Sequence, residues 1–359
     1  MTQFADVYRG KRVLVTGHTG FKGSWLTLWL KDLGAEVIGV SLPHSSNSNH
    51  WTLNDLPIDD RRLDICNAES LQIVLNETRP EIVFHLAAQA LVRKSYKNPL
   101  ETWSTNVMGS VNILEACRHL PSVRAIVSIT TDKCYQNQEW PWGYRESDRL
   151  GGHDPYSASK ACAELVVESY RSAFFNTENA PLLATARAGN VIGGGDWSEN
   201  RLIPDLVRAL ESNQSLEIRS PGATRPWQHV LESLSGYLLL GQKLLSGDRS
   251  FADAWNFGPE PEGNRTVAEV LEKLNKHWEK MEWHVDSQSQ PHEANLLYLD
   301  SAKARSRLGW SPVWNIDTTI EKTAQWYEAW LSNNKVISRQ QYDTYVEAAR
   351  NAKLEWTKS

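Results

Sequence analysis

The first half of the chain alternates short apolar runs with longer segments in which apolar residues recur every three or four positions. The apolar runs predict buried strands at residues 13–15, 35–40, 62–65, 81–88 and 125–129. The longer segments predict helices at about residues 21–33, 68–78, 98–119 and 155–175. Regular alternation of strand and helix is typical of a parallel sheet that helices cover on both faces through right-handed crossovers. We therefore expect an α/β fold built on a doubly wound parallel sheet.

The second half of the chain is less regular. After a predicted strand at residues 182–187, loops and the glycine run 193–195 separate shorter segments, with helices predicted at residues 202–210, 230–245, 266–278, 316–330 and 339–356 and a strand at 254–258. We expect residues 1–187 to form the sheet domain, joined by returning segments at about 229–258 and 314–330. Residues 188–228 and 259–313 would form a smaller interleaved C-terminal lobe, and residues 331–359 a helical tail.

Composition narrows the classes of protein that this fold could serve. The 359 residues suffice for one large core or two modest ones, and 41% hydrophobic with 23% charged residues is typical of a globular protein in water. The formal net charge of -5 argues against a general nucleic-acid binder, which needs a surplus of lysine and arginine. No apolar run is long enough for a membrane span, and the N-terminus lacks the pattern of a signal peptide. We expect a cytoplasmic protein without nucleic-acid or membrane partners.

The cysteines and histidines give no sign of a cross-link or a metal. The four cysteines are scattered, without a Cys-x-x-Cys pair, at Cys66, Cys117, Cys134 and Cys162. The histidines are not clustered. Neither a disulfide framework nor a metal site is therefore predicted.

A glycine turn follows the first predicted strand. Gly17, Gly20 and Gly23 lie between that strand and a predicted helix, with the spacing Gly-x-x-Gly-x-x-Gly. Such a turn brings bare backbone N–H groups to the positive end of a helix, where a Cβ would hold a ligand away. The turn therefore predicts a cradle for the pyrophosphate of a dinucleotide.

The end of the second predicted strand departs from the usual dinucleotide pattern. A carboxylate normally stands there and takes the adenosine ribose hydroxyls of NAD. This chain has Ser41-Leu42-Pro43, followed by a polar loop, His44–Asn47. The residues leave NAD and NADP both open, because no acidic residue repels a 2′-phosphate and no arginine is visible to receive one.

Tyr156 and Lys160 stand four residues apart at the start of a predicted helix, so they share one face. An ammonium beside a phenol favours the phenolate, and a cationic nicotinamide ring would add to that effect. Tyr156 could then act as a base well below its free pKa of about 10. The pair occurs by chance in many chains, but here it follows the glycine cradle and the fifth predicted strand, after which Thr131 stands.

Together these motifs resemble the extended short-chain dehydrogenase/reductase family, the group of nucleotide-sugar epimerases and dehydratases, from Lys11 to about Trp330. The matching segments are Thr16–Gly23, Asp64–Ile65, His85–Gln89, Asn106, Thr130–Asp132, Tyr156–Lys160, Arg187 with Asn190, and Arg225 ahead of His229–Val230. The resemblance implies a Rossmann-type sheet domain that binds NAD, with NADP as the alternative cofactor. It also implies a C-terminal lobe that binds a nucleotide sugar.

The resemblance further implies roles for individual residues. Thr131, Tyr156 and Lys160 would form a catalytic trio. The cofactor would be contacted by Gly17, Thr19, Gly20, Phe21, Lys22, Gly23, Asp64, Ile65, Leu86, Ala87, Ala88, Gln89, Asn106, Tyr156 and Lys160. The substrate would be contacted by Arg187, Asn190, Arg201 and Arg225.

The two residues after Thr131 separate reaction types within this group. An epimerase only oxidises and re-reduces a hydroxyl, whereas a 4,6-dehydratase also removes the proton on carbon 5 and expels the 6-hydroxyl, which asks for an extra acid and base. Asp132 is the candidate acid, and Lys133 stands where the dTDP-glucose enzymes of the group have a glutamate base. Burial or the nearby Lys160 would lower the pKa of Lys133 and suit it to this task, while Asp132 would act in the opposite direction. Alternatively, Lys133 only pairs with Asp132 or a phosphate.

The pattern therefore predicts a nucleotide-sugar 4,6-dehydratase and leaves three alternatives open. One is a 4-epimerase, and another is a dehydratase for a different nucleotide sugar, dTDP-glucose or GDP-mannose. The third is a non-catalytic NAD(P)-sensing binder, which has no reason to hold Thr131, Tyr156 and Lys160 together.

The helices predicted at residues 100–119 and 157–175 resemble the pair through which this family dimerises. We therefore expect a homodimer. The apolar residues of these helices would serve either an interface or the core; they include Val107, Val111, Leu114, Leu165 and Val166.

Overall fold

The computed structural model describes residues 2–43, 49–278, 281–286 and 295–358, so the polar loop His44–Asn47 lies outside the described residues. Its centre is a parallel sheet with the strand order β10-β6-β5-β4-β1-β2-β3. The strands are β1 (Arg12–Thr16), β2 (Glu36–Ser41), β3 (Asp59–Arg62), β4 (Ile82–His85), β5 (Ala125–Ile129), β6 (Leu182–Ala188) and β10 (Ala254–Phe257). From β1 the chain first adds β2 and β3 on one side and then β4, β5, β6 and β10 on the other side, so the strand order reverses between β1 and β4. This order is typical of doubly wound folds, and the predicted fold class is confirmed.

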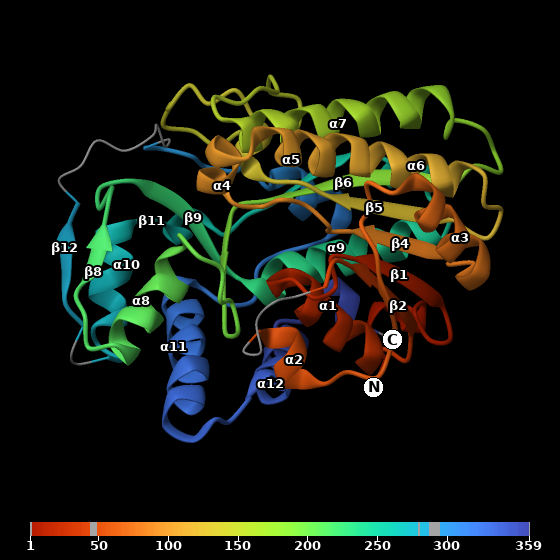
Figure 1. Ribbon diagram of the computed structural model, residues 1–359. Coiled ribbons are helices and arrows are strands. Elements are labelled where there is room, and N and C mark those ends of the chain that lie inside the picture. Colours follow the sequence, from red (N-terminus) through yellow and green to blue (C-terminus); the bar gives the residue numbers. More distant parts are fainter. Residues whose placement is uncertain (1, 44–48, 279–280, 287–294, 359) are drawn as a thin grey trace.

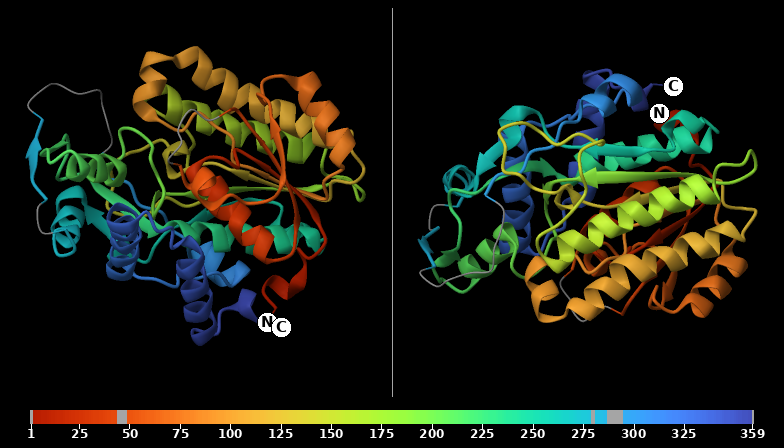
Figure 2. Two further views of the ribbon diagram at one scale, coloured as in Figure 1. Left: turned by 60° about the horizontal axis from the view of Figure 1, so that its bottom comes forward. Right: turned by 90° about the horizontal axis from the view of Figure 1, so that it is seen from above.

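Helices cover both faces of this sheet (Figures 1 and 2). On one face lie α3 (Ala68–Thr78), α6 (Gly109–Arg118) and α7 (Pro155–Ala173), and on the other α1 (Phe21–Asp32) and α9 (Val230–Leu245). Successive strand residues alternate between the two faces: Leu14 packs under the first group of helices, and Val13 and Val15 under the second. Because the sheet is buried on both faces, its strands read as continuous apolar runs.

The smaller lobe lies beyond the carboxyl ends of the sheet strands (Figure 1). Its strands pair in the orders β11-β9-β7 and β12-β8. Its elements are β7 (Asn190–Ile192), α8 (Leu202–Glu211), β8 (Leu216–Ile218), β9 (Thr224–His229), β11 (Asn264–Thr266), α10 (Val267–Leu274) and β12 (Trp283–Val285). The sequence predicts the helices of this lobe but not its strands: four of the five described strands, β7, β8, β11 and β12, have three residues and are too short to show a period, and β9 has six residues of which only Pro226 and Trp227 are apolar.

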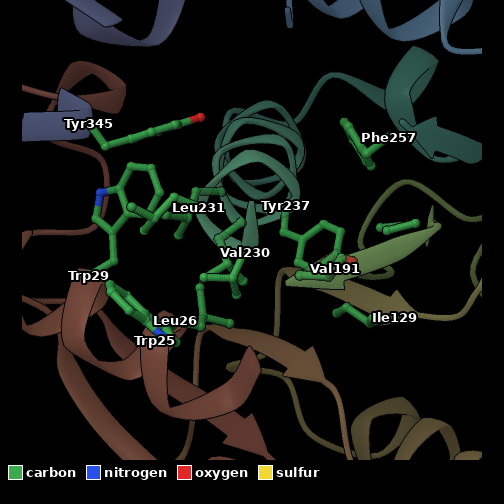
Figure 3. Close-up of a cluster of buried hydrophobic side chains, with 14 of the residues drawn as sticks. Trp25, Leu26, Trp29, Ile129, Val191, Val230, Leu231, Tyr237, Phe257 and Tyr345 are labelled. Atoms are coloured by element: carbon green, nitrogen blue, oxygen red, sulfur yellow. The ribbon is translucent and has the colours of Figure 1, made fainter. Parts of the chain in front are cut away.

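The last two helices differ from their predicted places. The segment expected to return to the sheet domain forms α11 (Ile316–Asn333), which packs on α10 and β9 of the smaller lobe. The expected tail contains α12 (Ser338–Asn351), whose Tyr345 joins the buried cluster around α9 (Figure 3). Its hydroxyl donates to Glu232 Oε2 at 2.8 Å, and Trp356 stacks on Phe4 with ring centroids 5.1 Å apart. The tail is therefore part of the core and holds the two chain ends together.

The bounds of several predicted elements differ in the structure, and two of these differences have a clear local cause. The strand expected at residues 62–65 ends at Arg62, because β3 is a largely exposed edge strand and the apolar pattern marks the segment after it. The long helix expected at residues 98–119 has three parts: α5 (Pro99–Trp103), a π-helical turn at Ser104–Met108, and α6. Such π turns are frequent at functional sites, and Asn106 lies in this one.

Shorter elements complete the described chain. They are α2 (His50–Asn54), α4 (Val92–Lys97), a π turn at Ala304–Leu308, and 3₁₀ turns at Phe4–Asp6, Asp132–Cys134, Arg249–Phe251, Pro261–Gly263 and Glu355–Thr357. All four cysteines carry free thiols. Over the described ranges, no helix combines the length and apolar character of a membrane span, and no group of three His, Cys, Asp or Glu residues is arranged to hold a metal ion.

Candidate active site

A cavity of about 810 Å³ lies between the carboxyl ends of the sheet strands and the smaller lobe. On the sheet side it is lined by the turns after β1, β4 and β5 and by the first residues of α7. On the lobe side it is lined by residues 188–193, the start of α8, residues 216–220, Ala223 and Arg225. Ligands of open α/β sheets bind at this place, where the strand order reverses.

The glycine turn between β1 and α1 forms one wall of the cavity. Gly17 has a φ of +73°, and a Cβ there would lie 2.8 Å from the backbone N of Ala87. A Cβ on Gly23 would lie 2.1 Å from the carbonyl oxygen of Gly17. A side chain at either position would therefore push the turn apart. Because Gly20 caps α1 without a side chain, the first N–H groups of the helix face the cavity, which suits a pyrophosphate.

Behind the wall at the ends of β2 and β3, an arginine that does not itself line the cavity contacts one of the lining residues. Ser41 Oγ lies 2.9 Å from Thr19 Oγ1 and accepts a hydrogen bond from Arg62 Nη1 at 3.2 Å. Ser41 and Arg62 are register partners in the β2–β3 pair. Local patterns do not specify that register, so the sequence alone does not bring the two residues together. The same wall is lined by Leu42, Pro43, Leu63, Asp64 and Ile65.

Gln89 and Asn106, predicted to contact the cofactor, are not on the cavity wall. The backbone N of Gln89 donates to Asn106 Oδ1 at 2.8 Å. Asn106 Nδ2 donates to the Gln89 carbonyl at 3.0 Å and to Ser159 Oγ at 2.9 Å. Asn106 therefore ties the segment after β4 to α7, and the wall itself is made by residues 86–88.

The three predicted catalytic residues meet in the cavity. Tyr156 and Lys160 lie one turn apart in α7, whose first turn is capped by the Asp154 side chain, and both line the cavity with Thr131. Lys160 Nζ donates to the carbonyl oxygen of Ile129 at 3.2 Å. Two short stretches of chain, the end of β5 and the start of α7, thus fix the trio.

Burial dominates the protonation of this trio. It raises the pKa of Tyr156 to about 12, while the hydrogen bond with Thr131 acts in the opposite direction. Burial also lowers the pKa of Lys160 to about 8, against the attraction of Glu164. Tyr156 is therefore a neutral phenol in this cavity, and a positive charge placed beside it would favour the phenolate.

Asp132 and Lys133 follow Thr131 in a 3₁₀ turn that Thr131 itself caps. Thr131 Oγ1 accepts from the Lys133 backbone N at 3.3 Å and donates to Asp132 Oδ1 at 2.9 Å. Asp132 is 2% exposed, and its Oδ2 makes no hydrogen bond within the described part of the chain. Burial raises the pKa of Asp132, although Lys133 and the Thr131 hydroxyl act in the opposite direction. A buried carboxyl with a raised pKa in a cavity wall is suited to donate a proton.

Lys22 brings a further amine into the cavity. It lies in the first turn of α1, and its Nζ donates to the Tyr237 hydroxyl at 3.4 Å. Burial, the nearby Arg201 and Lys160 lower the pKa of Lys22 to about 7, while Asp132 acts in the opposite direction.

Three of the four predicted substrate residues line the lobe side of the cavity, namely Asn190, Arg201 and Arg225. Arg201 forms an ion pair with Asp196 at 3.3 Å. Arg225 in β9 is 5% exposed. Two guanidinium groups on one wall suit a diphosphate, because a planar fork matches phosphate oxygens.

Arg187, the fourth predicted substrate residue, is outside the cavity. Its Nε and Nη2 donate to the two carboxylate oxygens of Glu164 at 2.9 and 2.8 Å, and its Nη1 donates to the Tyr135 hydroxyl at 2.8 Å. The predicted substrate contact is replaced by a buried ion pair, because β6 directs this side chain toward α7. Glu164 also accepts from Thr130, so the pair supports the catalytic segment from behind. Glu164 stands four residues after Lys160 on the same helix face, and this spacing is the sequence signal that could have revealed its supporting role.

Comparison with known proteins shows which family and which enzymes this chain resembles. The family model described as GDP-mannose 4,6 dehydratase matches residues 14–323. The CDP-glucose 4,6-dehydratase of Salmonella typhimurium is 47% identical over 353 residues, which cover 96% of this chain and 98% of that protein.

Solved structures agree on the fold. An epimerase from Methanothermobacter thermautotrophicus superposes with a TM-score of 0.80 and 26% identity, covering 93% of this chain and 96% of that one. A dTDP-glucose 4,6-dehydratase from Streptomyces venezuelae, solved with NAD and TYD bound, has a TM-score of 0.75 and 24% identity and covers 88% of this chain and 97% of that one.

Proposed function

The chain belongs to the GDP-mannose 4,6-dehydratase family, and within it we propose that the protein is an NAD-dependent CDP-glucose 4,6-dehydratase that forms CDP-4-keto-6-deoxyglucose. The observation that carries the choice of substrate is the 47% identity to the Salmonella enzyme, which extends over nearly the whole of both chains. The pair Asp132-Lys133, together with residues 193–197, also resembles this enzyme. The resemblance to the extended short-chain dehydrogenase/reductase family is confirmed by the family match.

The cavity fits NAD as the cofactor. Gly17, Gly20 and Gly23 leave room for a pyrophosphate at the start of α1. Ser41 and Ile65 would border the adenosine, and the catalytic trio would border the nicotinamide end. When bound, the cationic nicotinamide ring accepts a hydride from carbon 4 of the sugar and later returns it to carbon 6.

Tyr156 is the base of the oxidation step in this proposal. Its phenolate takes the proton of the 4-hydroxyl as carbon 4 becomes a ketone. Lys160, one turn away in the same helix, stabilises the phenolate by its charge. The Thr131 hydroxyl, which lines the cavity beside Tyr156, holds the substrate oxygen in line.

Asp132 and Lys133 serve the elimination step. The new ketone acidifies the proton on carbon 5. Lys133, or a water that it orders, removes that proton and returns it to carbon 5 when the hydride is delivered to carbon 6. The protonated Asp132 gives its proton to the 6-hydroxyl, which leaves as water. The unpaired Oδ2 of Asp132 and its raised pKa support this assignment.

A 4-epimerase is the second candidate, because the epimerase from M. thermautotrophicus shares the fold. An epimerase needs no acid for the 6-hydroxyl, so it gives no reason for a buried carboxyl at the end of β5. Asp132 therefore favours the dehydratase. The joint position of Thr131, Tyr156 and Lys160 in the cavity likewise counts against a non-catalytic binder.

We also propose that the protein is a cytoplasmic homodimer that pairs through α5, α6 and α7. Leu100 of α5, Met108 of the π turn between α5 and α6, and Leu165 of α7 are 83%, 52% and 53% exposed, and these helices lie side by side (Figure 2). An apolar surface of this kind is typical of an interface between protein chains. Leu114 instead belongs to the core. Sedimentation velocity at micromolar concentration should give twice the mass of the 40.7 kDa chain, and a monomer would contradict the dimer.

Turnover of nucleotide sugars tests the proposed activity. Purified protein supplied with NAD should convert CDP-glucose to a 4-keto-6-deoxy product, which is followed by its absorbance in alkali. We expect kcat/KM for dTDP-glucose, UDP-glucose and GDP-mannose to be at least about 100-fold lower, because an unmatched base leaves buried polar groups unpaired. A preference for another nucleotide sugar would assign a different dehydratase activity to this chain. If none of the four nucleotide sugars gave a product, the proposal would be wrong.

A further inference from the structure

We propose that a buried ion pair behind the catalytic trio, Glu164 with Arg187, keeps Lys160 in its charged form. The inference rests on the proposed function, because it gives Lys160 the task of stabilising the Tyr156 phenolate. Neither Glu164 nor Arg187 lines the cavity, so the pair acts through Lys160 and its members are positioning residues. The pair thereby sets the upper pH limit of the oxidation step.

The spacing of side chains along α7 connects the ion pair to the catalytic trio. Tyr156, Lys160 and Glu164 follow one another at intervals of four residues, so they lie along one face of the helix. Arg187 meets the inner end of this row from β6, through hydrogen bonds of 2.9 and 2.8 Å to the two oxygens of the Glu164 carboxylate. From the core toward the cavity the row is therefore a cation, an anion, a cation and a phenol. Each charge has an opposite charge as its neighbour, and the last position favours the phenolate.

The surroundings of Glu164 keep its carboxylate ionised, although the residue is 2% exposed. Burial acts to raise the pKa of Glu164, but the charge of Arg187 and the hydrogen bonds from Arg187, Thr130 and Thr185 outweigh burial and lower the pKa. Oε1 accepts from Thr130 and Arg187, and Oε2 accepts from Thr185 at 2.8 Å and from Arg187. These bonds fix the position of the carboxylate as well as its charge.

Glu164 supplies the negative charge that acts on Lys160. Burial lowers the pKa of Lys160 to about 8, and Glu164 acts in the opposite direction. The other titratable groups that couple to Lys160 are Cys134 after β5, His85 at the end of β4 and Lys22 at the start of α1. Burial raises the pKa of the Cys134 thiol and lowers that of His85, so both are neutral near neutral pH, and Lys22 can only add positive charge. Among these groups of the described chain, Glu164 is the one that favours a charged Lys160.

Loss of the Glu164 charge should therefore lower the pKa of Lys160. The charged lysine that the oxidation step needs is present below that pKa, so the alkaline limit of the reaction should move to lower pH. An opposite charge at this range changes a pKa by about one to three pH units. The direction of the change separates this role from a merely structural one, because general damage to the site lowers the rate at every pH.

An NMR titration of protein labelled with ¹³C at the lysine Cε atoms tests the inference, with Lys160→Met to assign the signal. Glu164→Gln should lower the pKa of Lys160 by about one pH unit or more, and Glu164→Asp, which keeps the charge, by less than about 0.3. Glu168→Gln is the matched control, because Glu168 lies one turn further along α7 and is exposed, and it should leave the pKa unchanged. The pH profile of nicotinamide reduction by CDP-glucose should move together with the pKa of Lys160.

A double variant separates the loss of charge from misfolding. Glu164→Gln alone leaves Arg187 as a buried, unpaired cation and should lower the Tm, whereas Glu164→Gln with Arg187→Met removes both charges and should recover it. Lys160 should still titrate at the lowered pKa in this double variant. An unchanged pKa of Lys160 in the folded double variant would overturn the inference, as would an equal change in Glu168→Gln. The titration needs no sugar substrate, so its outcome is independent of whether CDP-glucose is turned over.

Discussion

Tyr156→Phe should lower kcat for CDP-glucose by about 10³-fold and leave the dissociation constant of NAD within about threefold. The substitution removes only the hydroxyl that takes the substrate proton, while the ring keeps its buried place at the start of α7. Lys160 and Thr131 stay in position. Lys160 does not replace the lost hydroxyl as the base, because its Nζ is held by the Ile129 carbonyl. Steady-state turnover and dinucleotide titration on the same protein check both halves of the prediction.

Tyr96→Phe is the matched control for this variant. Tyr96 also lines the cavity, but it is 38% exposed and belongs to α4, whereas the trio comes from α7 and the end of β5. Its loss of a hydroxyl should change kcat by no more than about threefold. If Tyr156→Phe kept more than about a tenth of the activity, another group would be the base and the assignment of Tyr156 would be wrong.

Asp132→Asn should stop the reaction between oxidation and elimination. Asparagine still accepts the Thr131 hydrogen bond, but it has no acidic proton to give to the leaving 6-hydroxyl. We expect product formation to fall by about 10²- to 10³-fold, while oxidation of carbon 4 continues. Reduced nicotinamide should therefore accumulate to about one equivalent per site in a stopped-flow absorbance experiment. Lys133→Met should give the same accumulation, because without the base the carbon 5 proton stays in place.

Asp205→Asn controls for the replacement of a carboxyl by an amide on the cavity wall. Asp205 also lines the cavity, but it pairs with Arg208 on the surface of α8 and has no part in the mechanism. It should turn over normally. Full activity in Asp132→Asn, or loss of the oxidation step together with the elimination, would contradict the role of Asp132 as the acid. Accumulation in Asp132→Asn but not in Lys133→Met would assign the carbon 5 base to another group.

The features of the site that the sequence predicts are local ones. Tyr156 and Lys160 are found because a helix places residues four apart on one face, and the glycine turn because its spacing is fixed within one strand–helix connection. Asp132 and Lys133 follow from the end of an apolar run. Each of these inferences needs only a few neighbouring residues, and in each case the structure places the side chains in the cavity wall.

The features that the sequence does not predict depend on pairing between distant segments. Arg62 contacts Ser41 because the register of β2 with β3 places them side by side. Arg187 points away from the substrate cavity because it pairs with Glu164 on α7. The tail is similar: α12 looks like a separate amphipathic helix until Tyr345 is seen to bind Glu232. Patterns along the chain show that a residue is apolar or charged, but not which partner it meets.

The path of one hydrogen atom tests the dehydratase assignment most directly. CDP-glucose deuterated at carbon 4 is supplied to the protein with unlabelled NAD, and the product is examined by mass spectrometry and NMR. A 4,6-dehydratase built on this cavity places the deuterium on carbon 6 of a 4-keto-6-deoxy sugar. Deuterium returned to carbon 4 of an epimerised sugar, with the 6-hydroxyl retained, would contradict it.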